Sequence, residues 1–343
     1  MSAHPIDYET LSEWTEPFRD WHYYPEHVID PEPGIDGHPD VVRTDVPTVY
    51  QIPGDDRYYM SFVGFNGDGY KTFVAESEDL VHWSEPRLAM GFGPEDGFDH
   101  GGVILGAYLY DSYDLDAPRR LKRHDGYYWS LYGGYPRQGS YEPRPGAEGL
   151  ARSEDGIHWE RATEDPILSV YDADCGDWEQ SCIYQPWLVE HEGTYYNFYN
   201  AAEGSVEQTG LAVSDDLYEW ERSDRNPIVE TGPPASYNSQ FSSDPKVFRH
   251  DDHWVMLFFG VGRDGAHIMA AFSWDLQHWT VNPEPLYRAG GHPDGLDERF
   301  AHKISLVYEA DEDRYYMFYN AVGDAGRGIG LLTSEPLSDV ERP

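Results

Sequence analysis

The sequence contains little positive charge. Only four of its 24 basic residues are lysines (Lys71, Lys122, Lys246 and Lys303), whereas 63 residues are Asp or Glu, for a net charge of -39. A surface of this sign repels nucleic acid and anionic membranes, so neither is expected as a partner. Such a charge indicates a halophile that keeps high salt in its cytoplasm. At about 1 M salt the Debye length falls to roughly 3 Å, so the repulsion between the acidic side chains is screened.

Cysteine and long apolar runs are also scarce. Cys175 and Cys182 lie seven residues apart, whereas a zinc site or redox motif needs closer pairs or more ligands, so we interpret them as two buried thiols. No run approaches the 18 apolar residues of a membrane helix, and residues 1–5 lack the features of an export signal. We therefore expect a cytoplasmic protein.

Aromatic residues and turn formers are abundant: the chain has 27 Tyr, 11 Trp, 34 Gly and 25 Pro. A dense aromatic segment recurs five times, at 57–62, 126–132, 194–199, 253–259 and 314–319. Each is preceded by a turn, which predicts a strand in each copy. Aromatic strands separated by turns are typical of an all-β fold.

A second pattern follows the first four aromatic segments. A serine stands six residues before a tryptophan in each case: Ser77 and Trp83, Ser153 and Trp159, Ser214 and Trp220, Ser273 and Trp279. A strand, a tight acidic turn and a Trp that opens the next strand would repeat in this way. Four strands per repeat of about 60–70 residues predict the blades of a β-propeller.

The fifth copy ends before any such tryptophan, so its outer strand must come from elsewhere. The N-terminal stretch with Trp14, Phe18 and Trp21 is available, and we predict that it closes the ring by pairing into the last blade. The sequence therefore predicts one five-bladed propeller domain over residues 1–343. Its blades are expected at approximately 41–90, 99–168, 180–230, 242–287 and 300–337 plus the N-terminal strand. The longest insertion, at 139–146, is predicted to be a loop over the funnel.

The innermost strand of each blade should line the central channel and should precede each aromatic segment. These inner strands carry X-Pro pairs such as Val46-Pro47 and Asp244-Pro245. Together with the small–Ser–acidic–x–x–x–Trp hairpin, they make the chain resemble the five-bladed glycoside hydrolases of families 43, 32, 68, 117 and 130. The resemblance covers nearly the whole chain and implies a carbohydrate substrate.

The resemblance also implies acidic residues around the funnel, with a base or nucleophile at the start of the first inner strand. Asp45 is that residue here. When Pro47 is aligned with Pro245, however, Val46 rather than Asp45 matches Asp244. A bulge in the strand would be required to bring Asp45 to the catalytic position. Family 43 relatives carry Asp and Glu on the third and fourth inner strands, where this chain has Gln185 and Asp244. Asp244 is the candidate acid, and Glu179 and Glu203 are competing ones. Each carboxylate has an alternative reading as a strand-entry or turn residue.

Two of the four lysines, Lys246 and Lys303, fall on inner strands, which points to an anionic sugar, a phosphate site of the family 130 kind, or simple neutralisation of funnel carboxylates. The remaining candidates for substrate binding are Asp99, His100, Gln185, Trp187, His267, Arg299, His302 and Trp21. His302 falls where some family 43 members place a histidine near a metal, so Ca²⁺ near His302 is considered, although no oxygen-rich loop is visible.

Three functions remain open at this level. The leading one is a glycosidase that acts at a chain end with paired carboxylates and, as in family 43, with inversion. The second is a phosphate-dependent glycoside phosphorylase, and the third is a carbohydrate-binding propeller without catalysis.

Overall fold

The computed structural model describes residues 6–337, and almost all of its regular structure is β. A helix, α1 (Tyr8–Trp14), and a 3-10 turn, η1 (Glu16–Phe18), precede the strands. Residues 1–5 and 338–343 lie outside the described part. No helix within 6–337 is long and apolar enough to cross a membrane.

The strands form antiparallel units of four, here called repeat units 1 to 5. Unit 1 contains β2 (Arg43–Gln51), β3 (Tyr58–Phe65), β4 (Tyr70–Ser77) and β5 (Arg87–Met90). Unit 2 contains β6 (Gly102–Tyr108), β8 (Tyr127–Tyr135), β9 (Ala147–Ser153) and β10 (Glu160–Arg161), with β7 (Arg123–His124) also on β8. Unit 3 contains β11 (Cys182–His191), β12 (Thr194–Glu203), β13 (Val206–Ser214) and β14 (Glu221–Arg222).

Units 4 and 5 follow the same plan. Unit 4 contains β15 (Phe241–His250), β16 (His253–Gly262), β17 (Gly265–Ser273) and β18 (Thr280–Val281). Unit 5 contains β19 (Phe300–Glu309), β20 (Arg314–Gly323), β21 (Gly326–Thr333) and, from the N-terminal segment, β1 (His22–Tyr23).

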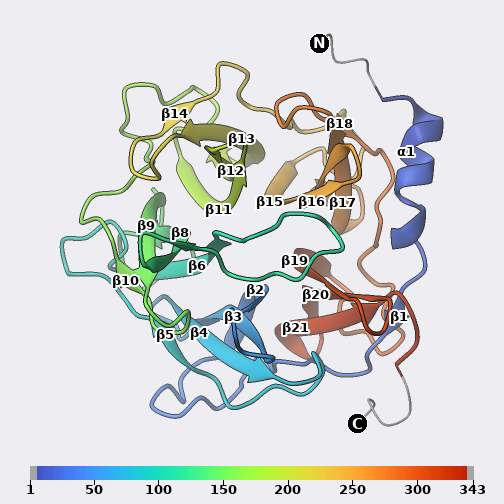
Figure 1. Ribbon diagram of the computed structural model, residues 1–343, viewed down its shortest axis with the longest axis horizontal. Helices are drawn as coiled ribbons and strands as arrows, with labels where there is room; N and C mark the ends of the chain where they lie inside the picture. The colour runs from blue at the N-terminus through green and yellow to red at the C-terminus, as the bar shows by residue number, and fades with distance from the viewer. Residues whose placement is uncertain (1–5, 338–343) are drawn as a thin grey trace.

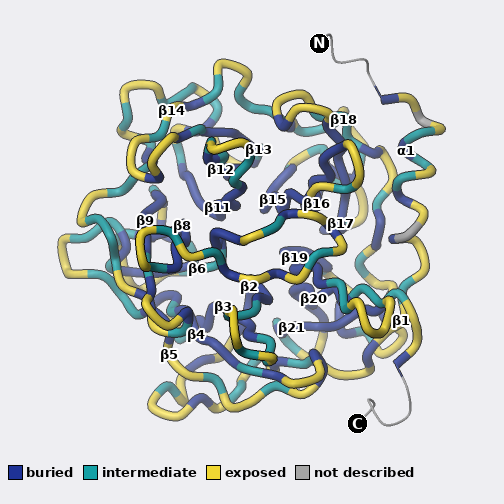
Figure 2. The backbone as a smooth tube through the Cα atoms, in the orientation of Figure 1, coloured by how far each residue is buried: buried dark blue, intermediate teal, exposed yellow. Residues whose placement is uncertain are grey.

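The first strand of each unit lies near the middle of the molecule (Figure 1), where the backbone is mostly buried (Figure 2). Unit 5 contacts unit 1 directly: the Val49 amide donates to Ser305 Oγ at 2.9 Å, and Asn320 Nδ2 donates to the Thr44 carbonyl at 3.0 Å. The first and last units therefore lie side by side.

The five aromatic segments are strands, as predicted: they lie in β3, β8, β12, β16 and β20. The constant serine-to-tryptophan spacing has a physical cause in the turns after β4, β9, β13 and β17. In the first turn the Asp79 amide donates to Ser77 Oγ at 3.1 Å, and the His82 amide donates to Asp79 Oδ1 at 2.8 Å. The same two bonds recur after Ser153, Ser214 and Ser273. Because these side chains replace backbone partners, they fix the length of the turn.

A β-bulge interrupts the first strand of units 1, 3, 4 and 5. One residue in each bulge has a positive φ: Val46 (53°), Gln185 (56°), Asp244 (56°) and Lys303 (52°). A bulge breaks the alternation of side chains along a strand. Asp45 therefore occupies the same place as Ser243 and His302, one residue before the positive-φ position.

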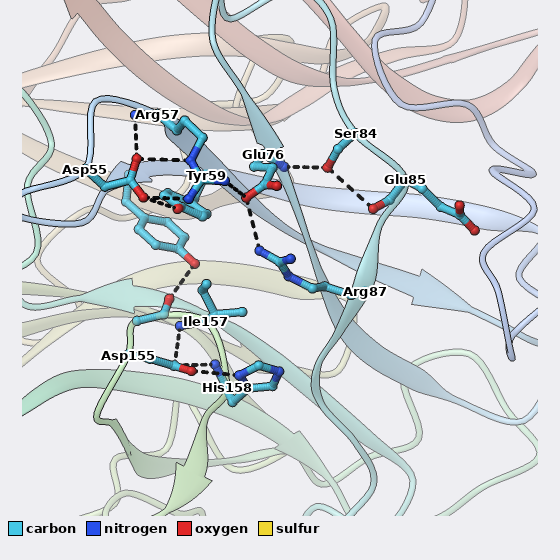
Figure 3. A network of polar contacts seen from close by, with 12 residues as sticks. Asp55, Arg57, Tyr59, Glu76, Ser84, Glu85, Arg87, Asp155, Ile157 and His158 are labelled. Atoms are coloured by element: carbon cyan, nitrogen blue, oxygen red, sulfur yellow. Dashed lines mark hydrogen bonds and ion pairs between the residues drawn. The ribbon is translucent and has the colours of Figure 1, made fainter.

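Several arginines of the acidic surface form ion pairs. In Figure 3, Arg57 joins Asp55 at 2.7 Å and Glu76 at 2.8 Å, and Arg87 reaches the same Glu76 carboxylate at 3.1 Å. These contacts link the β2–β3 turn, β4 and β5 of unit 1. Since the pairs are partly exposed, each contributes little, on the order of 0–1 kcal/mol.

The two cysteines differ in burial. Cys182 is buried, whereas Cys175 is only half-buried, so the expectation of two buried thiols holds for Cys182 alone. Cys175 lies in the irregular segment between β10 and β11, where neighbouring side chains cover it only in part.

A fully buried carboxyl group, Glu148 on β9, couples stability to pH. Burial raises its pKa to about 8, while the hydrogen bond from Asn197 Nδ2 at 2.5 Å lowers it. Between its unfolded value of 4.5 and about 8, the folded chain holds a proton that the unfolded chain releases. The free energy of unfolding should therefore fall as pH rises through this window, by about 1.4 kcal/mol per pH unit.

We expect Glu148→Gln to remove that slope and to raise stability at pH 8 relative to the parent protein. Urea unfolding at several pH values between 5 and 8, at constant salt, measures both effects. The exposed Glu203→Gln is the matched control and should keep the parent slope. An unchanged slope in the Glu148 variant would contradict the assignment.

Candidate functional site

One pocket of about 190 Å³ lies among units 3, 4 and 5, beneath the loop that joins β8 to β9. In Figure 1 this loop extends across the middle of the molecule, as predicted for the insertion at 139–146. The pocket is lined by Tyr141, Glu142, Tyr184, Gln185, Asn200, Glu207, Phe241, Phe259, Val261, Ala266, Phe300, His302, Lys303 and Arg327.

Asp45 lies beside the pocket and is 1% exposed. Its Oδ2 accepts from Arg327 Nη1 at 2.7 Å and from Lys303 Nζ at 3.3 Å, and its Oδ1 accepts from the Val46 amide at 2.9 Å. Burial raises the pKa of Asp45, but the two cations outweigh burial and hold it well below its usual range. Asp45 is thus an ionised carboxylate that fixes Lys303 and Arg327 at the pocket wall.

Glu207 on β13 has the opposite electrostatic environment. It is 7% exposed, and its Oε2 accepts from Ser243 Oγ at 2.8 Å. Burial raises the pKa of Glu207, and the charge of Glu142 raises it further, against the lowering effect of hydrogen bonds from Tyr184 and Ser243. A buried carboxyl with a raised pKa that lines a pocket is suited to donate a proton.

Glu142 is carried by the loop over the pocket. Its backbone has φ 51°, a left-handed conformation that is costly for a residue with a side chain. The carboxylate is 32% exposed and lies 3.8 Å from Lys303 Nζ. The preceding residue, Tyr141, accepts a hydrogen bond at its hydroxyl from Arg327 Nη1 at 2.6 Å. The same hydroxyl lies 3.3 Å from Asp45 Oδ2.

The surroundings of His302 do not suit a Ca²⁺ ion. Its ring lies between Phe259 and Phe300, and its Nδ1 is 3.2 Å from the Asn320 carbonyl. Burial lowers the pKa of His302 to about 3, and Arg327 and Lys303 lower it as well. A calcium site needs six to eight oxygen ligands. No group of three or more His, Cys, Asp or Glu side chains within the described residues is placed to hold a metal.

Of the other residues proposed from the sequence, Gln185, His302 and Lys303 line the pocket, whereas Asp244 and Lys246 do not. Asp244 is buried and its Oδ1 pairs with Lys246 Nζ at 2.8 Å. Lys246 also lies 5.1 Å from the Trp187 ring centre and lines a smaller cavity between β2, β6 and β11. The Asp244–Lys246 pair therefore lies outside the pocket that Gln185 and Lys303 line, although all three strands have the same bulge.

Glu179 and Asp99 occupy equivalent places in two units, each three residues before the first strand. Glu179 Oε2 accepts from the Tyr199 hydroxyl at 2.9 Å, and Arg222 Nε lies 3.0 Å from Oε1. Asp99 makes the same contacts with Tyr132 at 3.0 Å and Arg161 at 2.6 Å. Because the same contacts occur in two units, we interpret them as structural contacts that hold the strands of each unit together. Neither Glu179 nor Asp99 lines the pocket.

The remaining candidates are also outside the pocket lining. Trp187 is buried and donates to the Val247 carbonyl at 3.0 Å, and Trp21 packs against the core beside Phe18. His267 is buried and contacts the Arg263 carbonyl at 2.9 Å. His100 and Arg299 contact the carbonyls of Gly93 and Gly323. Their roles in substrate binding stay predictions.

Sequence reasoning missed Glu207, Glu142, Asn200 and the phenylalanines of the pocket as site residues. A signal for Glu207 exists: it forms the parallel bridge to the next unit at the position that Tyr70 takes in unit 1 and Ala266 in unit 4. Glu207 is thus the one acid at a repeat position where units 1 and 4 have an aromatic and a small residue. Such a difference at an equivalent position indicates a role other than packing.

Comparison with solved structures defines the class to which the fold belongs. A structure described as a glycoside hydrolase has a TM-score of 0.82 at 23% identity, covering 99% of both proteins. The same values apply to a structure described as a BT0996 RGII complex. A family 117 glycoside hydrolase of Zobellia galactanivorans has a TM-score of 0.61 at 12% identity, covering 92% of this chain and 90% of its own. At these identities the likeness concerns the fold, which is that of the propeller glycoside hydrolases.

The family follows from the sequence. Residues 115–295, more than half of the chain, match the family described as "Glycosyl hydrolases family 32 N-terminal domain". The chain therefore belongs to this family, and it is a glycosidase. No curated protein matches it.

Proposed function

We propose that the protein hydrolyses a glycosidic bond at the end of a carbohydrate chain, with Glu207 as the general acid. The observation that carries the proposal is the pair of pocket carboxyl groups in contrasting environments: Glu207 is buried with a raised pKa, and Glu142 is partly exposed beside Lys303. Two carboxyl groups whose environments separate their roles are what glycoside hydrolysis requires. A pocket covered by a loop favours a chain end over the middle of a polymer.

In this mechanism Glu207 gives its proton to the leaving oxygen as the bond to the anomeric carbon breaks. Glu142 takes a proton from a water molecule, whose oxygen forms the new bond to that carbon. Lys303 and Arg327, held by Asp45, position hydroxyl groups near the reacting centre. Attack by water in one step inverts the anomeric centre. Inversion is the outcome implied by the resemblance to family 43.

We further propose that the five repeat units are the blades of one five-bladed propeller domain, closed by the N-terminal strand. The pairing of β1 with β21 and the contacts between units 5 and 1 support this architecture. A closed ring leaves no unpaired edge strand at the point where the first and last units meet.

Nitrophenyl glycosides in molar NaCl, with and without phosphate, test the function. Hydrolysis independent of phosphate is expected, and proton NMR of the first-formed product reveals its anomer. Turnover only with phosphate would identify a phosphorylase, and binding without turnover would identify a carbohydrate-binding protein. The panel includes uronides, because an anionic substrate was predicted from the inner-strand cations.

The roles of Glu142 and Asp45 can be distinguished by isosteric substitution. We expect Glu142→Gln to lower kcat by about 10³-fold, the scale expected for a lost base, and Asp45→Asn to cost only about 10-fold to 10²-fold through misplaced cations. Steady-state kinetics on one substrate measures both. If Asp45→Asn proves the more damaging, Asp45 is the base that the resemblance implies.

We also propose that the protein works at high salt in a halophilic cytoplasm. With a net charge of -39, carboxylates repel one another across the surface unless salt screens them. In dilute buffer we expect the protein to unfold, and circular dichroism after dialysis from molar salt measures this. A spectrum that does not change would refute the proposal.

A further inference from the structure

We infer that the pocket holds an uncharged sugar unit, recognised through a hydroxyl group that bridges Gln185 and Asn200. This inference rests on the proposed function and names the substrate class of the same site.

Asn200 lines the pocket and carries an unpaired acceptor. Its side chain is fully buried, and its Nδ2 donates to Ser243 Oγ at 2.7 Å. Ser243 Oγ in turn donates to Glu207 Oε2 at 2.8 Å, so the direction of the network fixes Oδ1 of Asn200 as the remaining acceptor. Within residues 6–337, this Oδ1 has no hydrogen-bond partner.

Gln185 lines the same pocket and carries an unpaired donor. It is 3% exposed, and its Nε2 has no partner within the described part of the chain. A buried polar atom without a partner is costly, so a ligand that pairs both atoms is favoured. A hydroxyl group accepts from Gln185 and donates to Asn200, whereas a carboxylate can only accept.

His302 provides a second acceptor of the same kind. With its Nδ1 directed at the Asn320 carbonyl and its ring neutral, Nε2 is left to accept. Such an acceptor also requires a donating group on the ligand. Sugar hydroxyls meet the requirement at both places.

The charges of the pocket are already matched. Lys303 lies near Asp45 and Glu142, and Arg327 pairs with Asp45 through Nη1. Two cations therefore face two carboxylates. Because Lys303 and Arg327 each already have a carboxylate partner, neither is free to pair with an anionic substrate. The net charge of -39 further disfavours the approach of an anion.

Besides its charged residues, the lining contributed by units 4 and 5 has an apolar wall that consists of Phe241, Phe259, Val261, Ala266 and Phe300. An apolar wall suits the C–H face of a sugar ring, while the polar wall reads its hydroxyl groups. The two walls together fit one neutral glycosyl unit.

The first test compares substrates in molar NaCl, where long-range repulsion is screened. Nitrophenyl glycosides of neutral pentoses and hexoses are measured against glucuronide and galacturonide. The best neutral substrate should exceed either uronide by about 100-fold or more in kcat/KM, the scale on which a site with unpaired buried polar groups discriminates. A uronide as the best substrate would overturn the inference.

The second test removes hydroxyl groups one at a time from the best substrate. One monodeoxy analogue should lose about 100-fold or more in kcat/KM with the parent protein and less than about 10-fold with Asn200→Ala, because its partner is then already absent. Asn197→Ala is the matched control: Asn197 lies on the same strand and is buried, with an unpaired Oδ1, but does not line the pocket. The Asn197→Ala variant should discriminate between the substrate and its monodeoxy analogue as strongly as the parent protein does.

The outcomes separate this inference from the proposed function. If the parent protein tolerates every deoxy analogue equally, the hydroxyl bridge is wrong while hydrolysis stands, whether or not the Asn200 variant folds. If no glycoside is turned over, the proposed function fails, and calorimetry with free arabinose, xylose, galactose and the two uronates tests the inference alone. Binding of a neutral sugar supports it, and binding of a uronate only, or of none, overturns it.

Discussion

Glu207→Gln will lower kcat by about 10²-fold to 10⁴-fold on substrates with poor leaving groups, because glutamine keeps the side-chain size but cannot donate the proton. The loss should be smaller on nitrophenyl glycosides, whose leaving group needs little protonation. Since Glu207 is active when protonated and its pKa is raised by burial, the activity of the parent protein should fall as pH rises through that pKa. The variant should lose this alkaline limb.

The exposed Glu203→Gln is the matched control for this experiment. Glu203 ends the preceding strand, accepts from Ser181 Oγ at 2.9 Å and does not line the pocket. Its variant should retain both the rate and the pH profile. Equal losses in the two variants, or an alkaline limb that persists in the Glu207 variant, would remove Glu207 from the mechanism.

Much of the fold could be predicted because its determinants are local and repeated. The aromatic strands recur as continuous segments, and the Ser-to-Trp spacing is set by side chains that bond amides only two or three residues away. The pairing of β1 with β21 could be anticipated for another reason: the last unit lacks a strand that the earlier units have.

The site was less predictable because bulges break the alternation from which facing residues are deduced. Val46, Gln185, Asp244 and Lys303 share one backbone position and one sign of φ, yet only Gln185 and Lys303 line the pocket. Glu142 lies in the predicted covering loop, but no repeat aligns with that loop. Glu207 depends on the neighbouring unit for its contacts with Ser243, which no spacing within its own strand indicates.

Removal of residues 1–30 will prevent the chain from folding. The truncation takes away β1, whose residues pair with Thr333 and Leu332, and the Ile29 bridge to Ile329. It also removes buried Leu11, Phe18, Tyr24 and Ile29, each of which contributes on the order of 1.5–3 kcal/mol of burial. Since a domain is stable by only about 5–15 kcal/mol, this loss is sufficient to unfold it. Circular dichroism and thermal melting in molar salt measure the effect.

A rearranged protein provides the control for this truncation. Because His22 pairs with Thr333, a short turn can connect the end of β21 to the start of β1. A chain in which residues 20–40 follow residue 335 through such a turn, and which begins at residue 41, restores the strand without α1. The rearranged protein should melt cooperatively. Its melting temperature should be lower than that of the parent protein, because the stabilisation that α1 contributes is lost. If the truncated chain itself melts like the parent protein, the N-terminal strand is dispensable and the ring does not depend on it for closure.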